Sequence, residues 1–233
     1  MLDSLLASVR DHSREFTVYR GDEQTDLETQ FAAHSVEIAH RQLPPHGPEP
    51  FVIVEEDGEF AGAVPVGSLE RLLEPPVVRP PEPGDVSEGY RVLFEILDET
   101  VFTAMGRRQL LTVSREIEER AFRTGAGTLR VGFQTLSAFE PQVEVYRTLA
   151  TDTALDIHIY AVDDWSPPHI SGVTYHDYAE NTHERYWVLA FDGGGDESRA
   201  CGLVAQQRGD EYDGFWSDDP AVVADITAAL TDE

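Results

Sequence analysis

The chain has 233 residues, 44 of them Asp or Glu and 17 of them basic, which gives a formal net charge of −27 at neutral pH. The acids are dispersed and 41% of the residues are hydrophobic, so the composition excludes a disordered acidic tail and allows a folded core. It also argues against a nucleic-acid partner, because binding nucleic acid requires clustered cations that neutralise several phosphates.

The net charge and the choice of basic residue predict a halophilic protein. A charge of this size repels itself in dilute buffer, whereas at about 1 M salt the Debye length is only about 3 Å and the repulsion nearly vanishes. All 17 basic residues are arginine, whose planar guanidinium keeps paired hydrogen bonds where long-range attraction is screened. A GC-rich genome would produce the same preference for arginine, so that alternative stays open.

Cysteine usage and the first residues of the chain predict a cytoplasmic location. The one cysteine, Cys201, excludes a disulfide framework and is expected to be a small buried residue of a strand, since it lies in the apolar run ACGLVA. The segment at residues 1–13 is amphipathic but too short and too acidic for a signal peptide. No apolar run approaches the roughly 20 residues that span a bilayer, so we expect no membrane partner.

The first half of the chain shows helix patterns interleaved with strand patterns. The capping box Thr25–Glu28 opens a short helix, and Asp57-Gly58 favours a hairpin turn between two strands. In chain order, the expected elements are a helix at 2–9, a strand at 16–19, a helix at 25–31, strands at 36–38, 51–54 and 60–64, and a helix from Ser68.

A proline-rich segment separates the two halves. Residues 74–84 hold five of the 14 prolines of the chain. Because proline removes amide donors and holds the backbone extended, this segment is expected to be a stiff connector. The predicted domains are therefore an N-terminal α/β module at 1–74, a proline-rich linker at 75–89 and a second module at 90–233.

The second half repeats the order of elements in the first. A helix with Leu110, Ile117 and Ala121 on one face is predicted to stop at Gly125. The expected elements are helices at 90–97 and 110–124, a strand at 129–133, a helix at 143–150, strands at 155–160, 187–191 and 200–205, and a helix from Pro220. This order predicts an α/β layered sandwich with a mixed β-sheet, and it allows two similar αβαβββα halves.

The segment from Arg107 to Arg130 carries local positive charge, with six arginines against three glutamates. One interpretation is a docking face for an anion or an acidic partner. The other, which we favour, is a solvated helix face whose arginines are tied up by Glu116–Arg120 and Glu119–Arg123 pairs four residues apart.

The sequence contains no established catalytic or metal-binding motif. The glycines at 193–195 lie between two aspartates and lack the Lys-Ser/Thr of a phosphate loop, so a hairpin turn is favoured. His176 and His183 have no metal-site spacing, and no G-x-S-x-G elbow is present. Asp163 and Asp164 form a carboxylate pair, but ordinary loop residues are the favoured interpretation.

A small-molecule cleft is the binding site that the aromatic residues favour. Tyr160, Asp163 and Trp165 follow a strand whose other face is apolar, and ligand clefts of α/β sheets open at such strand ends. Gln134 ends the preceding strand and is expected at the same rim. A mostly apolar pocket with a few polar groups is the usual small-molecule site.

Several segments of the second half, taken in order, resemble the DICT sensory domain family. They are Ser114–Glu118, Gly127–Leu129, Gly132–Gln134, Tyr146–Ala150, His158–Tyr160 followed by Asp163, the strand at Trp187, and Gly214–Pro220. The resemblance covers about residues 95–230, with Ser217 where the family usually has threonine. It points to the haloarchaeal, stand-alone type, because the first half is similar to the N-terminal extension of haloarchaeal members.

The resemblance implies a signalling role, since DICT domains occur beside diguanylate cyclases, phosphodiesterases and histidine kinases, and a part in light response has been proposed for them. It supplies no catalytic residues and no metal ligands. The positions that match recurring family residues are Glu118, Gln134, Tyr146, Trp187, Trp216 and Asp219. The candidate ligand-binding set combines four of these positions with the cleft residues and with one arginine of the Ser114–Glu118 segment; its members are Arg115, Glu118, Gln134, Tyr146, Tyr160, Asp163, Trp165 and Trp216.

We therefore expect a stand-alone cytoplasmic sensory domain that is not catalytic and binds an unknown small molecule or signalling protein. Two alternatives stay open. One is an enzyme with a cryptic acidic or metal site at Asp163, Asp164 or His176, and the other is a protein-binding scaffold that uses the arginine-rich helix. The sequence identifies no cofactor or chromophore, and it leaves the oligomeric state open, a homodimer included.

Overall fold

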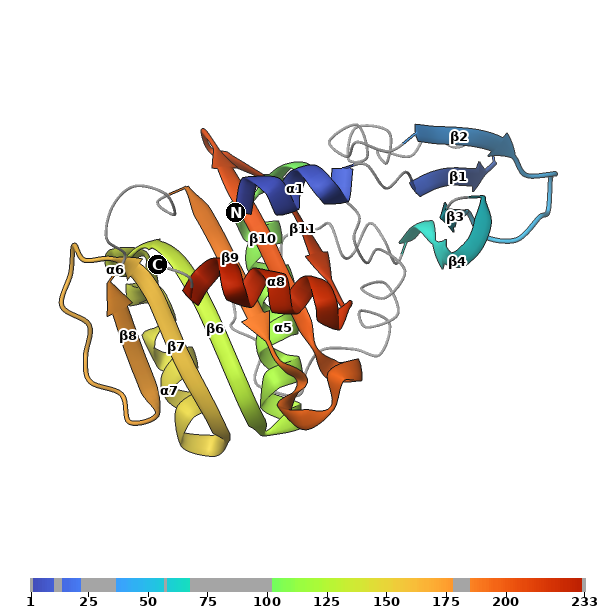
Figure 1. The fold of residues 1–233 in the computed structure, drawn as a ribbon. Helices are drawn as coiled ribbons and strands as arrows, with labels where there is room; N and C mark the ends of the chain where they lie inside the picture. Colours follow the sequence, from blue (N-terminus) through green and yellow to red (C-terminus); the bar gives the residue numbers. More distant parts are fainter. Residues whose placement is uncertain are drawn as a thin grey trace.

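The computed structural model describes residues 2–10, 14–21, 37–56, 58–67, 102–177 and 185–231. These residues form two mixed β-sheets, the larger of which has helices on both faces (Figure 1), and this confirms the predicted α/β class. The expected helices at 25–31, from Ser68 and at 90–97 lie outside the described residues, as does the proline-rich linker. The domain boundaries therefore stay a prediction.

Seven strands form the larger sheet, in the order β5-β11-β10-β9-β6-β7-β8. Their bounds are β5 Phe102–Gly106, β6 Ala126–Thr135, β7 Ala154–Val162, β8 Val173–Asp177, β9 Tyr186–Phe191, β10 Cys201–Arg208 and β11 Glu211–Ser217. The strands β6, β7 and β8 are parallel to one another, and all other neighbours are antiparallel. A helical crossover joins β6 to β7, as parallel pairing requires.

One face of the larger sheet, which we call the α5 face, is covered by three helices. They are α5 Arg107–Thr124, α6 Leu136–Phe139 and α7 Val143–Asp152. The α5 helix buries Leu110, Ile117 and Ala121, the predicted stripe, against this face. Gly125 follows its last residue with a φ of 74°, a conformation that favours glycine, so the predicted helix stop is confirmed.

The opposite face, which we call the α8 face, packs against α8 Pro220–Thr231 and α1 Leu2–Arg10 (Figure 1). Leu2 and Leu6 of α1 share a buried cluster with Val223 and Ile226 of α8. The first helix of the predicted N-terminal module therefore lies on the larger sheet. A hydrogen bond from Gln206 Nε2 to the Asp3 carboxylate, 3.2 Å long, adds a polar link between α1 and β10.

The smaller sheet has four strands in the order β2-β1-β3-β4. They are β1 Arg14–Arg20, β2 Glu37–Gln42, β3 Phe51–Glu56 and β4 Glu59–Pro65. Alternate apolar side chains on one side form its core, as period-two patterning requires; these are Phe16, Val18, Val52, Val54 and Val64.

The two sheets share a four-strand unit. In the smaller sheet, β1 pairs in parallel with β2 and antiparallel with β3, which then pairs antiparallel with β4. In the larger sheet, β6 pairs in the same way with β7 and β9, and β9 with β10. This common topology supports the expectation of two similar halves at the level of the strands.

The second half nevertheless has more strands than its pattern predicts. The strands β5, β8 and β11 were not expected. β5 and β8 are short edge strands of five residues each, and β11 contains Gly214 among the acids Glu211 and Asp213. The alternation of β5 and β8 is too brief to stand out, and in β11, which lies inside the sheet between β5 and β10, the two acids and the glycine interrupt the apolar pattern.

The glycines at 193–195 connect β9 to β10, which confirms the predicted hairpin turn. Asp192 Oδ1 accepts hydrogen bonds from the backbone N–H groups of Thr128 and Gly194, each 2.9 Å long. A Cβ atom on Gly194 would lie 2.4 Å from the carbonyl oxygen of Ala126. The glycine is therefore needed because the turn packs directly against the start of β6.

Candidate functional site

A buried polar network joins α5 to α7 on the α5 face. The Tyr146 hydroxyl donates a hydrogen bond of 2.7 Å to Glu118 Oε1. The Arg115 guanidinium donates to Glu118 Oε2 and to Gln142 Oε1. Tyr146 is 0% exposed and Glu118 is 5% exposed, so both carboxylate oxygens are bound within the protein rather than by water.

The electrostatics of this network favour a neutral phenol beside an ion pair. Burial, and then the charge and hydrogen bond of Glu118, raise the pKa of Tyr146 well above its ordinary value. Burial opposes the charge of Arg115, but Glu118 and Tyr146 outweigh it and raise the pKa of this guanidinium. Tyr146 therefore acts as a donor, and the network holds one fixed arrangement of α5 against α7.

Aromatic rings extend this network toward the centre of the sheet. The Phe139 ring meets the Tyr146 ring edge-on, with centroids 5.3 Å apart. The Phe133 ring lies 5.5 Å from Phe139 and 5.9 Å from Trp187, and Trp187 meets Tyr212 edge-on at 6.2 Å. These five residues form what we call the aromatic cluster, and aromatic pairs at such distances stabilise a rigid core.

Trp187 is the one member of the aromatic cluster with an unsatisfied polar atom among the described residues. Its indole Nε1 is buried and has no hydrogen-bond partner in the described part of the chain. The Arg107 guanidinium carbon lies 6.0 Å from the centroid of the same ring, within the range of a cation–π contact. A buried donor without an acceptor costs about 1–3 kcal/mol, so this position has hydrogen-bonding capacity that an acceptor would satisfy.

The structure brings together three of the predicted ligand-binding residues, Arg115, Glu118 and Tyr146. Trp216 is buried in the same α5-face core, and Trp165 packs against that core from its rim. Sequence reasoning missed Gln142, which carries no distinguishing signal in the sequence. It also left Trp187 and Arg107 out of the candidate set, although the family resemblance included Trp187.

The remaining predicted residues lie elsewhere. Tyr160 is on the α8 face, where its ring stacks on His176 with centroids 4.4 Å apart. Gln134 donates a 3.3 Å hydrogen bond to Gln207 at the exposed edge where β6 and β10 end. The backbone N–H of Asp163 donates to Asp177 Oδ1 at 3.2 Å. Tyr160 is thus separated by the sheet from the Arg115–Tyr146 network.

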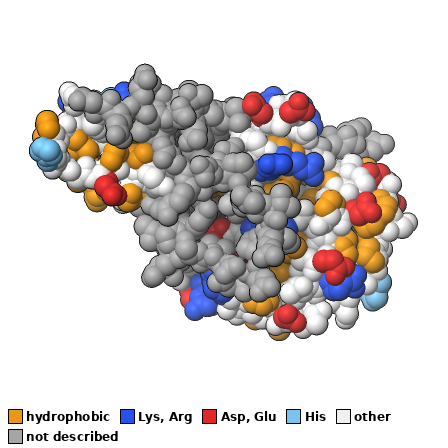
Figure 2. Space-filling view, turned by 180° about the vertical axis from the view of Figure 1, so that it is seen from behind, with side chains coloured by type: hydrophobic (Ala, Val, Ile, Leu, Met, Phe, Trp, Pro, Cys, Tyr) orange, Lys and Arg blue, Asp and Glu red, His pale blue; other side chains and the backbone are white. Residues whose placement is uncertain are grey.

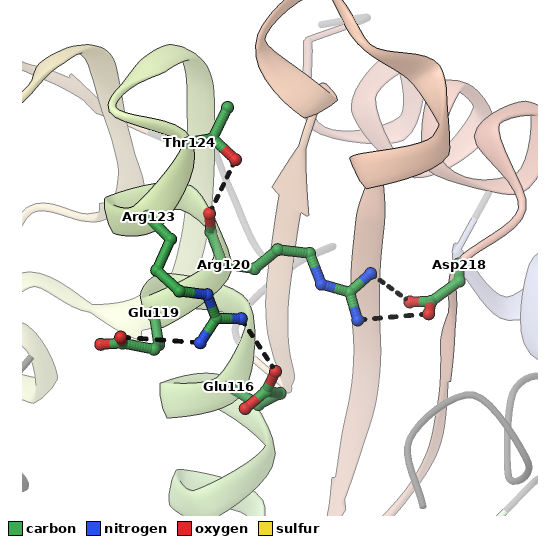
Figure 3. Close-up of polar contacts among 6 residues, drawn as sticks. All are labelled: Glu116, Glu119, Arg120, Arg123, Thr124 and Asp218. Carbon is green, nitrogen blue, oxygen red and sulfur yellow. Dashed lines mark hydrogen bonds and ion pairs between the residues drawn. The ribbon is translucent and has the colours of Figure 1, made fainter. Parts of the chain in front are cut away.

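Arg120 and Arg123, near the C-terminal end of α5, are paired with carboxylates (Figure 3). Arg120 makes a bidentate pair with Asp218, with distances of 2.9 and 3.2 Å. Arg123 pairs with Glu119 at 3.6 Å, as predicted, and also with Glu116 at 3.5 Å. The predicted Glu116–Arg120 pair is therefore replaced, because Arg120 reaches across to the residue that follows β11.

These pairs leave Arg120 and Arg123 bound to carboxylates rather than free to dock an anion. Arg120 is only 12% exposed in its side chain, and Glu116 is only 2% exposed, so the helix face is half-buried rather than solvated. Burial, which outweighs the nearby arginines, raises the pKa of Glu116. On the reverse side of the molecule, Figure 2 shows acidic and basic side chains interspersed over the described surface.

Metal and thiol chemistry find little support in the described residues. Within these ranges, no group of three or more His, Cys, Asp or Glu side chains is placed to hold a metal ion, and His183 lies outside them. Cys201 is buried in β10, as predicted. Burial raises the pKa of its thiol to about 12, so the reactive thiolate is not populated at neutral pH.

None of the helices in the described ranges has the length and apolarity needed to cross a lipid bilayer.

Comparison with curated proteins finds no match. Among solved structures, the chain is similar to a polyphosphate kinase from Porphyromonas gingivalis, known from a crystal structure, with 12% sequence identity and a TM-score of 0.40. The similarity covers 99% of this chain and 48% of that chain, so the chain spans about half the length of the kinase. A TM-score this low supports no inference about fold or function.

A family model matches residues 92–208, and its description is the sensory domain in diguanylate cyclases and two-component systems, DICT. The match spans 117 of the 233 residues. It includes α5, α7 and the strands from β6 to β10, and so contains the whole Arg115–Tyr146 network and most of the aromatic cluster. The chain therefore belongs to the DICT family of sensory domains.

Proposed function

We propose that this chain is a non-catalytic sensory module that binds a small ligand at the aromatic cluster of the α5 face and passes the resulting change to a separate signalling protein. The observation that carries the proposal is the buried, unpartnered indole N–H of Trp187, in a domain whose family has a sensory role. A ligand acceptor at this position would satisfy the donor and stack on the neighbouring rings.

The chemistry around Trp187 indicates the class of ligand. Phe133, Phe139 and Tyr212 offer aromatic faces and edges, and the indole offers one donor. Arg107 lies over the Trp187 ring at the N-terminus of α5, where the helix dipole adds partial positive charge. We therefore expect a planar or aromatic molecule with an acceptor atom and no strong positive charge.

A route for the signal runs along α5. Ligand contact with Phe133 and Phe139 would act on Tyr146, whose hydroxyl sets the position of Glu118. Near the C-terminal end of α5, Arg120 forms a bidentate ion pair with Asp218, which lies just before α8. A small displacement of α5 would therefore shift α8 on the opposite face of the sheet. We propose α8 and α1 as the output surface toward a partner protein.

Intrinsic fluorescence and thermal shift test the binding site. All three tryptophans, Trp165, Trp187 and Trp216, pack in or against the α5-face core, so a planar ligand bound there should change their emission. A panel of planar metabolites, including nucleotides and flavins, would be screened against the wild-type chain. A compound that raises the melting temperature should lose about tenfold or more in affinity in Trp187→Phe, because its acceptor loses the indole donor.

Trp165→Phe is the matched control, since it removes an indole from the rim of the same core. Binding should be retained there within about twofold. Equal affinity in wild type and Trp187→Phe would place any ligand elsewhere. Turnover of a compound in the panel would contradict the non-catalytic part of the proposal.

A further inference from the structure

A second polar cluster lies on the α8 face, on the three parallel strands. Its members are Arg130 of β6, His158 and Tyr160 of β7, and Thr174 and His176 of β8. In the sheet register, Arg130 is the partner of His158, which is the partner of Thr174, and Tyr160 is the partner of His176. Parallel strands lie about 4.8 Å apart, so these side chains form two adjacent rows on one surface.

The two histidines are held in a defined arrangement. His158 Nδ1 lies 2.8 Å from His176 Nε2, and His158 Nε2 lies 3.0 Å from Asp156 Oδ2. The His158 and His176 rings stack with centroids 5.1 Å apart, and His176 stacks on Tyr160 at 4.4 Å. The Asp156 carboxylate can only accept, so the neutral His158 ring carries its proton on Nε2. Its Nδ1 is then an acceptor, and His176 Nε2–H donates to it.

Arg130 is a half-buried cation without a counter-ion in the described part of the chain. Its Nε atom is buried and has no hydrogen-bond partner there, and no described carboxylate forms an ion pair with its guanidinium. The chain has 44 acidic residues, and the other half-buried arginines of this region, Arg115 and Arg120, each hold one of them. An unpaired buried guanidinium N–H points to a partner that is not part of these residues.

Among the described residues, no helix covers this surface along β7 and β8. In Figure 1, α1 and α8 lie in front of β9, β10 and β11, and α8 also contacts β6. The Thr174 side chain is exposed, and the His158 side chain is 19% exposed. Within the described part of the chain, the cluster is therefore accessible from the side opposite to α7.

We propose that Arg130, His158 and His176 form a binding site for a tetrahedral oxyanion, the phosphate group of a small molecule. The guanidinium supplies a planar fork that fits such a group. His158 holds the neighbouring His176 at the Nε2 atom of His176, and a proton taken up at His176 Nδ1 would make that nitrogen a further donor. The guanidinium fork would then bind two oxygens of a phosphate group and His176 Nδ1 a third, whereas a carboxylate offers only two oxygens. This site lies across the sheet from the aromatic cluster and does not depend on it.

The charges that face the histidines set the pH dependence of the site. Burial first, and then the nearby His158 and Arg130, lower the pKa of His176. Protonation of His176 would place a second positive charge beside the Arg130 guanidinium. Asp156 lies within hydrogen-bond distance of His158, with 67% of its side chain exposed, and the Tyr160 ring stacks on His176. A bound dianion would reverse this balance and raise the pKa of His176, so a proton would be taken up on binding.

Histidine NMR resonances test the site directly. The wild-type chain would be titrated with inorganic phosphate at constant ionic strength, and with sulfate across pH 5 to 8, because sulfate does not titrate in that range. Phosphate should shift the His158 and His176 signals in a saturable way. Sulfate should raise the pKa of His176, and its affinity should fall as the pH rises through the pKa of His176 in the complex.

Arg130→Gln should weaken phosphate binding about tenfold or more, because it removes the charged fork. His176→Gln is a second variant that keeps Arg130, and it should remove the pH dependence of sulfate binding. His169→Gln, at an exposed loop histidine, is the matched control and should bind as the wild type does. Circular dichroism of each variant would confirm the fold.

Three results would each overturn the proposal. One is an absence of phosphate-induced shifts at His158 and His176 in the wild type. Another is a phosphate affinity unchanged in a folded Arg130→Gln variant, which would leave an adventitious ion only. The third is acetate binding as tightly as phosphate, which would contradict a site for a tetrahedral oxyanion.

Discussion

At the scale of single residues, the contact between Tyr146 and Glu118 is central to the α5 face. Both side chains are buried, and the phenol is one of two protein donors to this carboxylate in the described structure. Both residues match recurring family positions, and the sequence alone left open whether that recurrence concerns folding or binding. The geometry assigns them first to fixing α5 against α7.

Tyr146→Phe removes the hydroxyl and leaves Glu118 Oε1 buried without its donor. The free energy of unfolding should fall by about 1–3 kcal/mol, as expected for a buried charged acceptor that loses a hydrogen bond. Denaturant unfolding measures this. Tyr175→Phe is the control, because Tyr175 is half-buried and donates to a neutral carbonyl, Pro168 O, at 3.0 Å, so its loss should be smaller. Equal stability of Tyr146→Phe and wild type would contradict a structural role for the network.

Residues of the candidate site differ in how far the sequence reveals them. Arg115, Glu118 and Tyr146 were identified from motif resemblance, but no pattern shows that they touch one another. Among the described residues, Trp187 Nε1 lacks a partner because of the groups that pack around β9, and Arg130 Nε lies beside His158 because of the register of three strands. Such tertiary juxtapositions carry no signal in local sequence.

At the scale of elements, long periodic segments were predicted well and short edge segments were not. The helix α5 shows its buried stripe at spacings of three and four residues and a glycine stop, and both are visible in the sequence. The strands β6 and β7 alternate over enough residues to be recognised. β8 has only five residues, so its alternation is indistinguishable from that of a loop.

The link between α5 and the segment before α8 provides a test at this scale. Asp218→Asn would keep the shape of the side chain but remove the negative charge of the carboxylate, which forms a bidentate ion pair with Arg120. Because both side chains are mostly buried, stability should fall by about 1–3 kcal/mol. The exposed pair Arg199–Asp196, half-exposed on both sides, is the control. Asp196→Asn should cost clearly less stability than Asp218→Asn, because solvent screens an exposed pair. Equal losses in the two variants would contradict a stabilising role for the buried pair between Arg120 and Asp218.

At the scale of the whole molecule, the fold combines a three-layer unit with a smaller sheet of related topology. The proposed small-molecule site lies on the α5 face and the proposed phosphate site lies on the α8 face. The larger sheet therefore separates the two sites. The strand β6 pairs with both β7 and β9. Its apolar side chains lie on the α5 face with the aromatic cluster, and its Arg130 lies on the α8 face with the two histidines. The net charge of −27 favours a salt-rich environment, and the halophilic origin stays a prediction.

Native mass spectrometry tests the central claim most directly. The wild-type chain and Trp187→Phe would be equilibrated with the small-molecule fraction of a cell extract, desalted and weighed intact, with an absorbance spectrum taken on the same samples. We predict a small organic adduct on the wild type that is lost on unfolding and is absent or much reduced in Trp187→Phe. A bare chain in both samples, or an adduct held equally by the variant, would contradict a ligand site at the aromatic cluster.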